Sequence, residues 1–419
     1  MPLSSSPPAP APARPSHGES NEEPPVCREL PTLVSSFVDT FVDYIVGGQF
    51  LGKEEEEIEG TKKKSTSGEG YGVHNKIPTY RPPVDRLIAI GDIHGDLSKA
   101  KESLKIAGVM DDNDRWIGGK TTVVQVGDLL DRGGEELRVI YLLEKLGRQA
   151  RKCGGDLIVM NGNHEIMNIE GDFRYATHSS SLEFQHWSYW YERGNKMKEV
   201  CDGIRRRDRL ISGDNDSKIP DTIPSHLKAR FAALRPGGPI SSRFLSKHPT
   251  VLVIGKTVFA HGGILPSHAS YGLERMNEEV REWILGKKGH FGPRYLHGRD
   301  AVVWVRKYSE IKERLCDCDV LEKALEAIQG SKRMIVGHTI QQPFGINGAC
   351  MNRVIRVDVG MSSGCGGAPP EVLEIKNDEN LRVLSKSERR DIEKSVPEQP
   401  FWKKRNDGLS SLLSETSVK

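Results

Sequence analysis

Five glycine-containing motifs constrain this chain most, because each places a polar side chain directly after an apolar run typical of a buried strand. The motifs are residues 91–95 (Gly-Asp-Ile-His-Gly), 127–133 (Gly-Asp-Leu-Leu-Asp-Arg-Gly), 162–165 (Gly-Asn-His-Glu), 261–263 (His-Gly-Gly) and 337–339 (Gly-His-Thr). In open α/β sheets, polar side chains beyond the carboxyl ends of the strands gather at one edge. We therefore expect five distant segments to contribute to a single polar site.

The residues between the first three motifs indicate an α/β fold. Apolar runs at 87–90, 121–126 and 157–160 alternate with helical periodicity, for example over 137–146. That alternation is typical of consecutive βαβ units and a parallel sheet. The chain has 419 residues, of which 36% are hydrophobic, so it is long enough to bury a full core.

The polar side chains of the motifs are those that hard and borderline divalent cations prefer as ligands. The candidate ligands are Asp92, His94, Asp128, Asn163, His261 and His338. We expect Asp128 to bridge two ions, because it lies between the other ligands in motif order. One ion would take the first three residues, and the other would take Asp128 with the last three. Two such ions acidify a shared water, and the resulting hydroxide can attack phosphorus in line.

Four further residues suit phosphoester hydrolysis. His164 follows Asn163 but is not among the candidate ligands, so we expect it to protonate the leaving oxygen. Asp131 is expected to orient that imidazole. Arg132 and Arg306 are candidate phosphate-binding residues, because a planar guanidinium donates paired hydrogen bonds to phosphate oxygens. A solvated or core-covering role is the alternative for both arginines.

The charge and hydropathy of the chain argue against two functional classes. The formal net charge is +2, and the basic clusters at 205–207 and 403–405 are short, so no nucleic-acid partner is expected. Apolar runs stay well below the roughly 20 residues that cross a bilayer, so no membrane span is expected.

Seven cysteines are scattered along the chain without a recognisable secretory leader, so reduced thiols are the expected state. Cys316 and Cys318 form the only close pair in the sequence. Without a second pair at matching spacing, we do not expect a zinc site there. Redox regulation stays an alternative.

The motifs lie in a central catalytic domain with less regular flanks. Residues 1–30 are rich in Pro, Ala and Ser and are predicted to be disordered. Residues 31–48 have the apolar spacing of an amphipathic helix, which we expect to dock on the catalytic domain. We interpret 49–84 as a linker, 85–375 as the catalytic domain and 376–419 as a polar C-terminal tail.

The segment 166–250 breaks the βαβ rhythm and is predicted to be an insertion beside the substrate pocket. Aromatic residues crowd its first part; we expect most of them in the core and some in the pocket wall. Residues 211–249 lack sustained periodicity, so we expect a long surface loop without catalytic residues there.

The five motifs closely resemble the signature series of the phosphoprotein phosphatases within the calcineurin-like metallophosphoesterases, over residues 85–375. The resemblance implies a four-layer fold in which a β-sandwich is flanked by helices. It also implies a two-metal centre, often active with manganese and with iron or zinc as alternatives. The residue roles given above are those that the resemblance implies as well.

The chain departs from the eukaryotic serine/threonine members after residues 337–339. It has no Ser-Ala-Pro-Asn-Tyr-Cys segment there, and residues 357–361 lead instead into Gly-Cys-Gly-Gly at 364–367. Together with Trp304 and Arg306, this pattern is similar to the Shewanella-like branch, and the amphipathic N-terminal segment is similar to its non-plastid plant-type members. That branch resembles enzymes that accept phosphotyrosine, so phosphoproteins carrying phosphotyrosine, phosphoserine or phosphothreonine are the expected substrates.

Three functions remain open at the level of sequence. The leading one is a protein phosphatase that uses a hydroxide held by two metal ions. Hydrolysis of dinucleoside polyphosphates or other small phosphoesters is an alternative on the same fold. A phosphoprotein-binding scaffold without turnover is the third, against which the intact His164 and Asp131 argue. The cytosol is the expected location, with the mitochondrial intermembrane space as the alternative, and the sequence names no regulatory partner.

Overall fold

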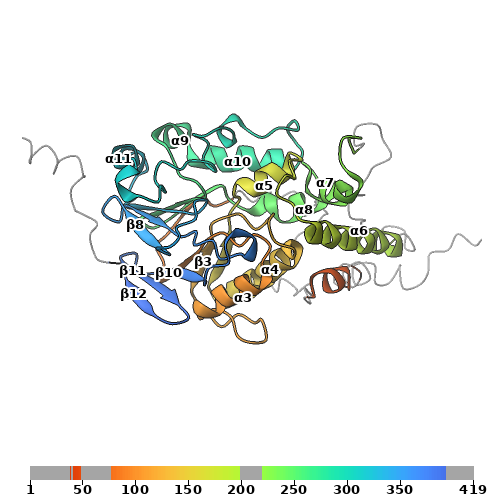
Figure 1. The fold of residues 1–419 in the computed structure, drawn as a ribbon, viewed down its shortest axis with the longest axis horizontal. Helices are drawn as coiled ribbons and strands as arrows, with labels where there is room; N and C mark the ends of the chain where they lie inside the picture. The colour runs from red at the N-terminus through yellow and green to blue at the C-terminus, as the bar shows by residue number, and fades with distance from the viewer. Residues whose placement is uncertain (1–37, 39–40, 49–76, 199–218, 393–419) are drawn as a thin grey trace, which may run out of the picture.

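The structure is a computed structural model that describes residue 38 and residues 41–48, 77–198 and 219–392. Two six-stranded sheets contribute apolar side chains to one continuous core. Helices α9, α10 and α11 lie beside one sheet, and α3 and α4 lie beside the other (Figure 1). This arrangement confirms the predicted α/β fold with mixed sheets flanked by helices. None of the described helices is both long and apolar enough to cross a membrane.

One sheet carries the first three motifs. Its strands in spatial order are β12 (Arg389–Asp391), β11 (Asn380–Ser385), β10 (Glu371–Lys376), β2 (Arg86–Ile90), β3 (Thr122–Gln125) and β4 (Asp156–Val159). Strands β2, β3 and β4 are parallel, with Leu87 opposite Thr122 and Val123 opposite Leu157. Their carboxyl ends therefore lie at the same edge, as the alternation of apolar runs and helical periodicity predicts.

The other sheet carries the last two motifs. Its strands in spatial order are β1 (Tyr80–Arg81), β5 (Val251–Ile254), β6 (Thr257–Ala260), β7 (Arg333–Val336), β9 (Val354–Arg356) and β8 (Asn347–Ala349). Strands β6 and β7 are parallel, so the motifs that follow them begin at the same edge of this sheet. Strands β5 and β6 pair in antiparallel register, which returns the chain to that edge.

The helices begin and end where the sequence provides local signals. Their bounds are α3 (Leu97–Ile106), α4 (Glu136–Lys152), α5 (Asn163–Ile169), α6 (His178–Lys198), α7 (Lys228–Leu234), α8 (Pro239–Arg243), α9 (Pro266–Tyr271), α10 (Leu273–Ile284) and α11 (Cys318–Glu326). Short 3-10 turns lie at η2 (Ser225–Leu227), η3 (Leu245–Lys247), η4 (Arg294–Leu296), η5 (Glu313–Leu315) and η6 (Ser363–Cys365). The carboxylates of Asp96 and Asp317 accept backbone hydrogen bonds at the starts of α3 and α11, as expected of N-cap residues.

The described part of the N-terminal segment, residue 38 and residues 41–47, is helical and packs against the catalytic domain. Val42 and Val46 are 2% and 6% exposed and join the main core. Asp43, which the apolar spacing places on the polar side of the helix, is also buried and makes two hydrogen bonds of 2.7 and 2.9 Å with Arg243. The predicted docking of this helix on the catalytic domain is therefore present for residues 41–48.

Two expected flanks prove to belong partly to the sheets. Tyr80 and Arg81, expected in the linker 49–84, form β1 and pair with β5. Strands β11 and β12 continue past residue 375, so the expectation of a polar tail from 376 is wrong for the residues of these strands. Alternation explains the error, because Leu381 and Val383 are buried on one face and are separated by polar Arg382, in a sheet that needs only one apolar face. Residues 1–37 and 393–419 lie outside the described part.

The expectation of a surface loop at 211–249 is wrong for residues 228–249. Helices α7 and α8 occupy this stretch, and Phe231, Leu234 and Ile240 are 6%, 0% and 1% exposed. Both helices are short, seven and five residues, so neither repeats its apolar spacing often enough to give a visible period. Tertiary packing rather than intrinsic helical pattern stabilises them.

A disulfide joins Cys318, at the start of α11, to Cys350, just after β8. This corrects the expectation of reduced thiols for these two residues. The bonded partners are 32 residues apart in sequence, so spacing gives no signal for the pairing, and the close neighbour Cys316 stays free and buried. Among the described residues, the free cysteines are Cys153, Cys316 and Cys365. Cys27 and Cys201 lie outside that part.

Replacing Cys318 and Cys350 together by serine is expected to lower the free energy of unfolding by about 2–4 kcal/mol, because the bond restricts the unfolded chain. Urea denaturation followed by circular dichroism measures this difference. The matched control is Cys153→Ser, which removes an exposed free thiol. Equal stability of the double variant and the wild type would contradict the assigned bond.

Candidate metal centre

The structure brings all six candidate metal ligands together where the strand ends of the two sheets meet. Asp92 and His94 follow β2, Asp128 follows β3, Asn163 begins α5 after β4, His261 follows β6, and His338 follows β7. All six side chains are buried, and the most exposed of them, His338, is 8% exposed. Burying this many polar groups is costly unless each finds a partner, so the site must be held by hydrogen bonds and charge compensation.

The carboxylate of Asp128 lies at the centre of this cluster. Its Oδ2 is 3.2 Å from Nε2 of His261, 3.7 Å from Nε2 of His94 and 3.8 Å from Nε2 of His164. The possible donor atoms form two groups, and within each group all atoms lie within 4.8 Å of one another. Asp128 belongs to both groups. The groups are His94, Asp128 and His164, and Asp128, His261 and His338. Asp128 therefore lies between the two groups, and its role as a bridging ligand stays a prediction.

The hydrogen bonds of two histidines leave their Nε2 atoms facing oxygen acceptors. Nδ1 of His94 lies 2.9 Å from the carbonyl oxygen of Leu130, and Nδ1 of His261 lies 3.0 Å from that of Val126. Each Nδ1 therefore carries a proton and donates it to the carbonyl. Nε2 of His261 then lies 2.8 Å from Oδ1 of Asn163, so either a proton on Nε2 or a bound cation must separate the lone pairs of these two atoms. Burial would lower the pKa of His261, but Asp128 raises it above its ordinary value, which allows such a proton when no cation is bound.

Two observations indicate that this charge can come from metal ions. Nε2 of His338 is buried and has no hydrogen-bond partner, which leaves a lone pair available for coordination. Burial and the neighbouring His261 and Arg306 hold the pKa of His338 well below its ordinary value, so this imidazole is neutral. Carboxylate, amide and neutral imidazole donors are the set that manganese, iron and zinc bind. The residues present therefore fit divalent ions.

Asp92 differs from the other candidate ligands, because it lies beside a second carboxyl group, that of Asp358. Burial, Asp358 and Asp128 together raise the pKa of Asp92 well above its ordinary value, although the backbone N–H of His338 donates to its carboxylate at 3.1 Å. Burial also raises the pKa of Asp358 to about 6. Carboxyl groups crowded in this way are stabilised by a bound cation. The motif pattern gave no ligand role to Asp358.

Glu165 holds the second motif loop in place through its backbone. Its carboxylate accepts hydrogen bonds of 2.8, 2.8 and 3.1 Å from the backbone N–H groups of Asp128, Leu129 and Leu130. It also accepts a 2.7 Å bond from the N–H of Gly162 at the start of α5. The last residue of the third motif thus fixes the ligand loops after two neighbouring strands.

Several site residues adopt a left-handed backbone conformation that is unfavourable for side chains other than glycine. Their φ angles are 47° at His94, 60° at Asp128, 68° at Asp131, 65° at Arg132 and 65° at His338. Strain of this kind persists only where the surroundings determine the conformation, and it clusters at functional sites. Glycines make room beside it: a Cβ on Gly162 would lie 2.2 Å from Oδ1 of Asp128.

The predicted proton-transfer pair is present as a short contact. Nδ1 of His164 lies 2.6 Å from Oδ2 of Asp131, and both side chains are buried. Burial alone would lower the pKa of His164, but Asp128 and Asp131 raise it above its ordinary value. The imidazole can therefore hold a proton at neutral pH. Because His164 lies as close to Asp128 as His94 does, distance alone does not separate a proton donor from a ligand.

The two candidate phosphate-binding arginines lie near different residues of the cluster. The guanidinium of Arg132 lies 5.0 Å from the ring centre of Tyr175, and that ring lies 5.1 Å from the imidazole of His164. Arg306 donates to the carbonyl oxygen of His338 at 3.3 Å and to Oγ1 of Thr339 at 2.9 Å. Both guanidinium groups are therefore beside residues of the cluster.

Sequence reasoning missed two residues that contact the proton-transfer pair. Asn168 donates to Oδ2 of Asp131 at 2.9 Å, and its spacing from His164 on α5 was the available signal, because residues four apart share a helix face. Arg230 donates to Oδ1 of Asp131 at 2.9 Å. No sequence signal pointed to Arg230, which lies in the segment expected to be a surface loop.

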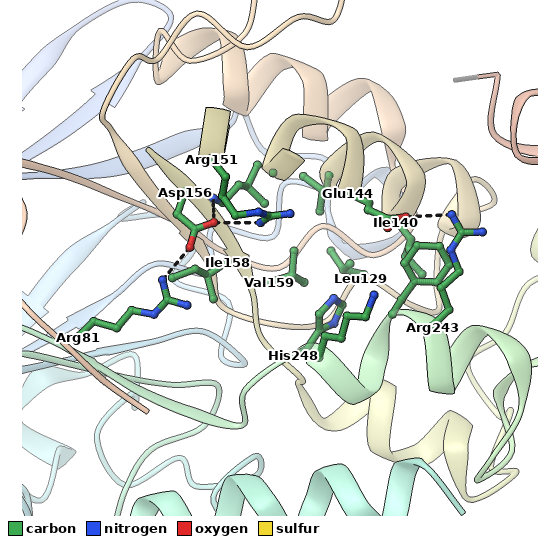
Figure 2. Close-up of a pocket in the computed structure, with 15 residues that line it drawn as sticks. Arg81, Leu129, Ile140, Glu144, Arg151, Asp156, Ile158, Val159, Arg243 and His248 are labelled. Carbon is green, nitrogen blue, oxygen red and sulfur yellow. Dashed lines mark hydrogen bonds and ion pairs between the residues drawn. The ribbon is translucent and has the colours of Figure 1, made fainter. Parts of the chain in front are cut away.

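A separate cavity of about 180 Å³ lies between α4, β4 and the turn after α8. Figure 2 shows Arg81 and Arg151 directed toward Asp156, while His248 points toward Leu129 and Val159. Its lining includes Leu129 of the second motif but none of the candidate ligands. The cavity therefore lies behind the motif loop and is distinct from the metal cluster.

Known proteins share this combination of motifs and fold. The family described as calcineurin-like phosphoesterase matches residues 85–341. Shewanella-like protein phosphatase 2 of Arabidopsis thaliana is 52% identical over 375 residues, which cover 87% of this chain and 90% of that protein. Shewanella-like protein phosphatase 1 of Plasmodium berghei is 27% identical over 71% of this chain and 74% of its own length.

Solved structures give the same fold. The crystal structure of a cold-active protein-tyrosine phosphatase from a psychrophilic Shewanella species matches with a TM-score of 0.54. It is 22% identical and covers 75% of this chain and 82% of its own. These matches confirm the family expected from the five motifs. The chain belongs to the calcineurin-like phosphoesterases and, among them, to the Shewanella-like protein phosphatases.

Proposed function

We propose that this chain is a metal-dependent protein phosphatase that hydrolyses phosphomonoesters on protein side chains. The observation that carries the proposal is the buried pair of His164 and Asp131, whose imidazole lies 3.8 Å from the central carboxylate of Asp128. A proton donor beside a cation-binding cluster is the arrangement that phosphoester hydrolysis needs. The 52% identity to a named protein phosphatase supports protein substrates over dinucleoside polyphosphates and over a scaffold without turnover.

The proposed metal ligands follow the two halves of the cluster. Asp92, His94 and Asp128 would hold one ion, and Asp128, Asn163, His261 and His338 would hold the second. Manganese is the proposed metal, with iron and zinc as alternatives, because oxygen and imidazole donors suit all three. When bound, the ions activate a water molecule and neutralise charge on the phosphate.

The remaining roles fall to side chains around the cluster. Arg132 and Arg306 bind phosphate oxygens and so orient the phosphorus toward the cluster. His164 donates a proton from Nε2 to the leaving oxygen, since its Nδ1 is engaged by Asp131. Asp131 keeps the imidazole in the tautomer and orientation that this transfer needs. Together these groups avoid expulsion of an unprotonated alkoxide.

An aromatic ring at the rim supports phosphotyrosine as an accepted substrate. Tyr175 is 41% exposed and lies beside both the proton donor His164 and the phosphate-binding Arg132. A substrate phenyl ring bound with its phosphate on Arg132 can pack on this exposed ring. The structural neighbours named protein-tyrosine phosphatases support the same substrate class.

The disulfide supports an oxidising compartment as the location. Stable disulfides such as Cys318–Cys350 are rare in the reducing cytosol. Of the two locations considered, we therefore favour the mitochondrial intermembrane space over the cytosol. Fractionation of cells that express the tagged full chain tests this choice.

Replacing His164 by alanine is expected to lower kcat on a phosphotyrosine peptide by about 10² to 10⁴-fold, because general-acid assistance to the leaving group is lost. Manganese content, measured by elemental analysis of the purified protein, is expected to stay that of the wild type. His226→Ala, which removes an exposed histidine outside the cluster, serves as the control. Loss of metal in His164→Ala would instead make His164 a ligand.

Removing metal with a chelator is expected to lower the melting temperature and abolish turnover, and added manganese is expected to restore both. At a manganese concentration 100 times the dissociation constant, binding stabilises the folded state by about 2.7 kcal/mol. Asp128→Asn should lose this metal-dependent stabilisation. Asp112→Asn, at a side chain that is 94% exposed, should retain it. A full metal response in Asp128→Asn would exclude the proposed centre.

Tyr175→Ala is expected to reduce kcat/KM for a phosphotyrosine peptide about fivefold more than for the matched phosphoserine peptide, since an aromatic pair contributes about 1 kcal/mol. Comparing the two peptides cancels any general effect on His164. Tyr175→Phe keeps the ring and should retain the preference. An equal loss on both peptides would mean that the ring does not select the substrate.

A further inference from the structure

Arg230 is a fully buried charged group that contacts the proton-transfer pair from outside the five motifs. It lies on α7, in the segment 166–250, and is 0% exposed. Its guanidinium reaches Oδ1 of Asp131 at 2.9 Å, Oδ1 of Asn168 at 2.7 Å and Oγ of Ser180 at 3.0 Å. It also lies 2.8 Å from Oε2 of Glu136. Four elements of the chain therefore converge on one buried cation.

The contacts of Arg230 occupy the side of Asp131 that does not face the imidazole. Oδ2 of Asp131 receives Nδ1 of His164 at 2.6 Å and Nδ2 of Asn168 at 2.9 Å. Oδ1 receives the guanidinium of Arg230. Rotation of the carboxylate would break bonds on both oxygens at once. Arg230 thus helps to fix the plane of the Asp131 carboxylate that faces His164.

Arg230 also fixes the orientation of the Asn168 amide. A guanidinium only donates hydrogen bonds, so the atom of Asn168 that faces it must be the carbonyl oxygen. The NH₂ group must then point the other way, where it donates to Asp131 and, at 2.8 Å, to the carbonyl oxygen of His164. The hydrogen bond from Asn168 to Asp131 therefore depends on the donor pattern of Arg230.

Stability alone does not account for this arrangement. A buried ion pair is often no more stabilising than apolar side chains of similar volume, because desolvating the charges costs about as much as their attraction returns. The rings of Phe173 and Phe184 already pack around the guanidinium, with ring centres 5.8 and 4.8 Å from its carbon. An apolar side chain would suit these rings, but it could not orient Asp131.

We propose that Arg230 is a positioning residue for catalysis, which holds Asp131 and Asn168 so that His164 presents its proton to the leaving group. The proposal rests on the proposed function of His164 as the proton donor. Through Arg230, the segment 166–250 would also contribute to proton transfer. Arg230 itself touches neither candidate ligands nor substrate, so its effect must pass through Asp131.

A double-mutant cycle tests this dependence. Arg230→Met is expected to lower kcat about 10- to 100-fold with little change in KM, as is typical when a supporting hydrogen-bond partner is lost. In an Asp131→Asn background, the same change is expected to have almost no further effect, because the group that it positions is already altered. Arg235→Met, at the end of α7, is the matched control and should leave kcat unchanged. Equal losses in both backgrounds would overturn the proposal.

Arg230→Lys keeps the cycle informative if Arg230→Met does not fold. Lysine retains the charge but lacks the planar fork, so it cannot serve Asp131 and Asn168 in the same geometry. We expect a smaller loss of kcat that again disappears in the Asp131→Asn background. Thermal unfolding of each variant separates this loss from lowered stability. A folded Arg230→Lys enzyme with a kcat loss independent of Asp131 would contradict the positioning role.

A readout without turnover separates this inference from the proposed function. The short bond between His164 and Asp131 should give the imidazole Nδ1–H a low-field proton resonance in protein labelled with ¹⁵N-histidine. Asp131→Asn identifies the signal by removing it. Arg230→Met is expected to shift or broaden it, even if the wild type hydrolyses no tested phosphopeptide, which would overturn only the proposed function. An unchanged resonance in folded Arg230→Met would overturn the positioning role.

Discussion

The carboxylate of Asp128 is the group on which the rest of the site depends. It is 1% exposed and has three imidazoles within 3.8 Å of Oδ2, so its charge cannot be left to solvent. The free-energy cost of desolvating a carboxylate is offset only where opposite charge and hydrogen bonds replace water. Imidazoles supply these from β2, α5 and β6, and both sheets are therefore needed to complete the surroundings of one side chain. The pairing of two sheets is therefore a requirement of the site as well as of the fold.

The strained backbone around that carboxylate is the second consequence. Asp128 and Asp131 both have positive φ, a conformation that an isolated loop would leave. The carboxylate of Glu165 binds three successive N–H groups of the same loop and holds it there. Glu165 accordingly contributes through the backbone rather than as a ligand. The third motif thus contributes in two ways. Asn163 and His164 face the cluster, and Glu165 holds the loop of the second motif.

The parts of the structure that could be predicted are those encoded by contiguous residues. Buried strands appear as short apolar runs, and a ligand placed directly after a strand has its position set by that strand, so all six candidate ligands could be named. The pairing of Cys318 with Cys350, the sheet partners of β1 and the contacts of Arg230 depend on residues that meet only after folding. The short helices α7 and α8 gave no period, and burial in the tertiary structure decides their conformation.

The site therefore has an inner part and an outer part with different origins. The inner part comes from strand ends, where the sheets themselves bring carboxylates and imidazoles together. The outer part comes from the segment 166–250, which supplies Tyr175 beside His164 and Arg230 behind Asp131. Under the proposed function, metal binding needs only the inner part, whereas proton donation and substrate selection need both. Differences in activity between enzymes that share these strand-end motifs are thus expected to follow the outer segment, since the fold leaves the cluster little freedom to vary.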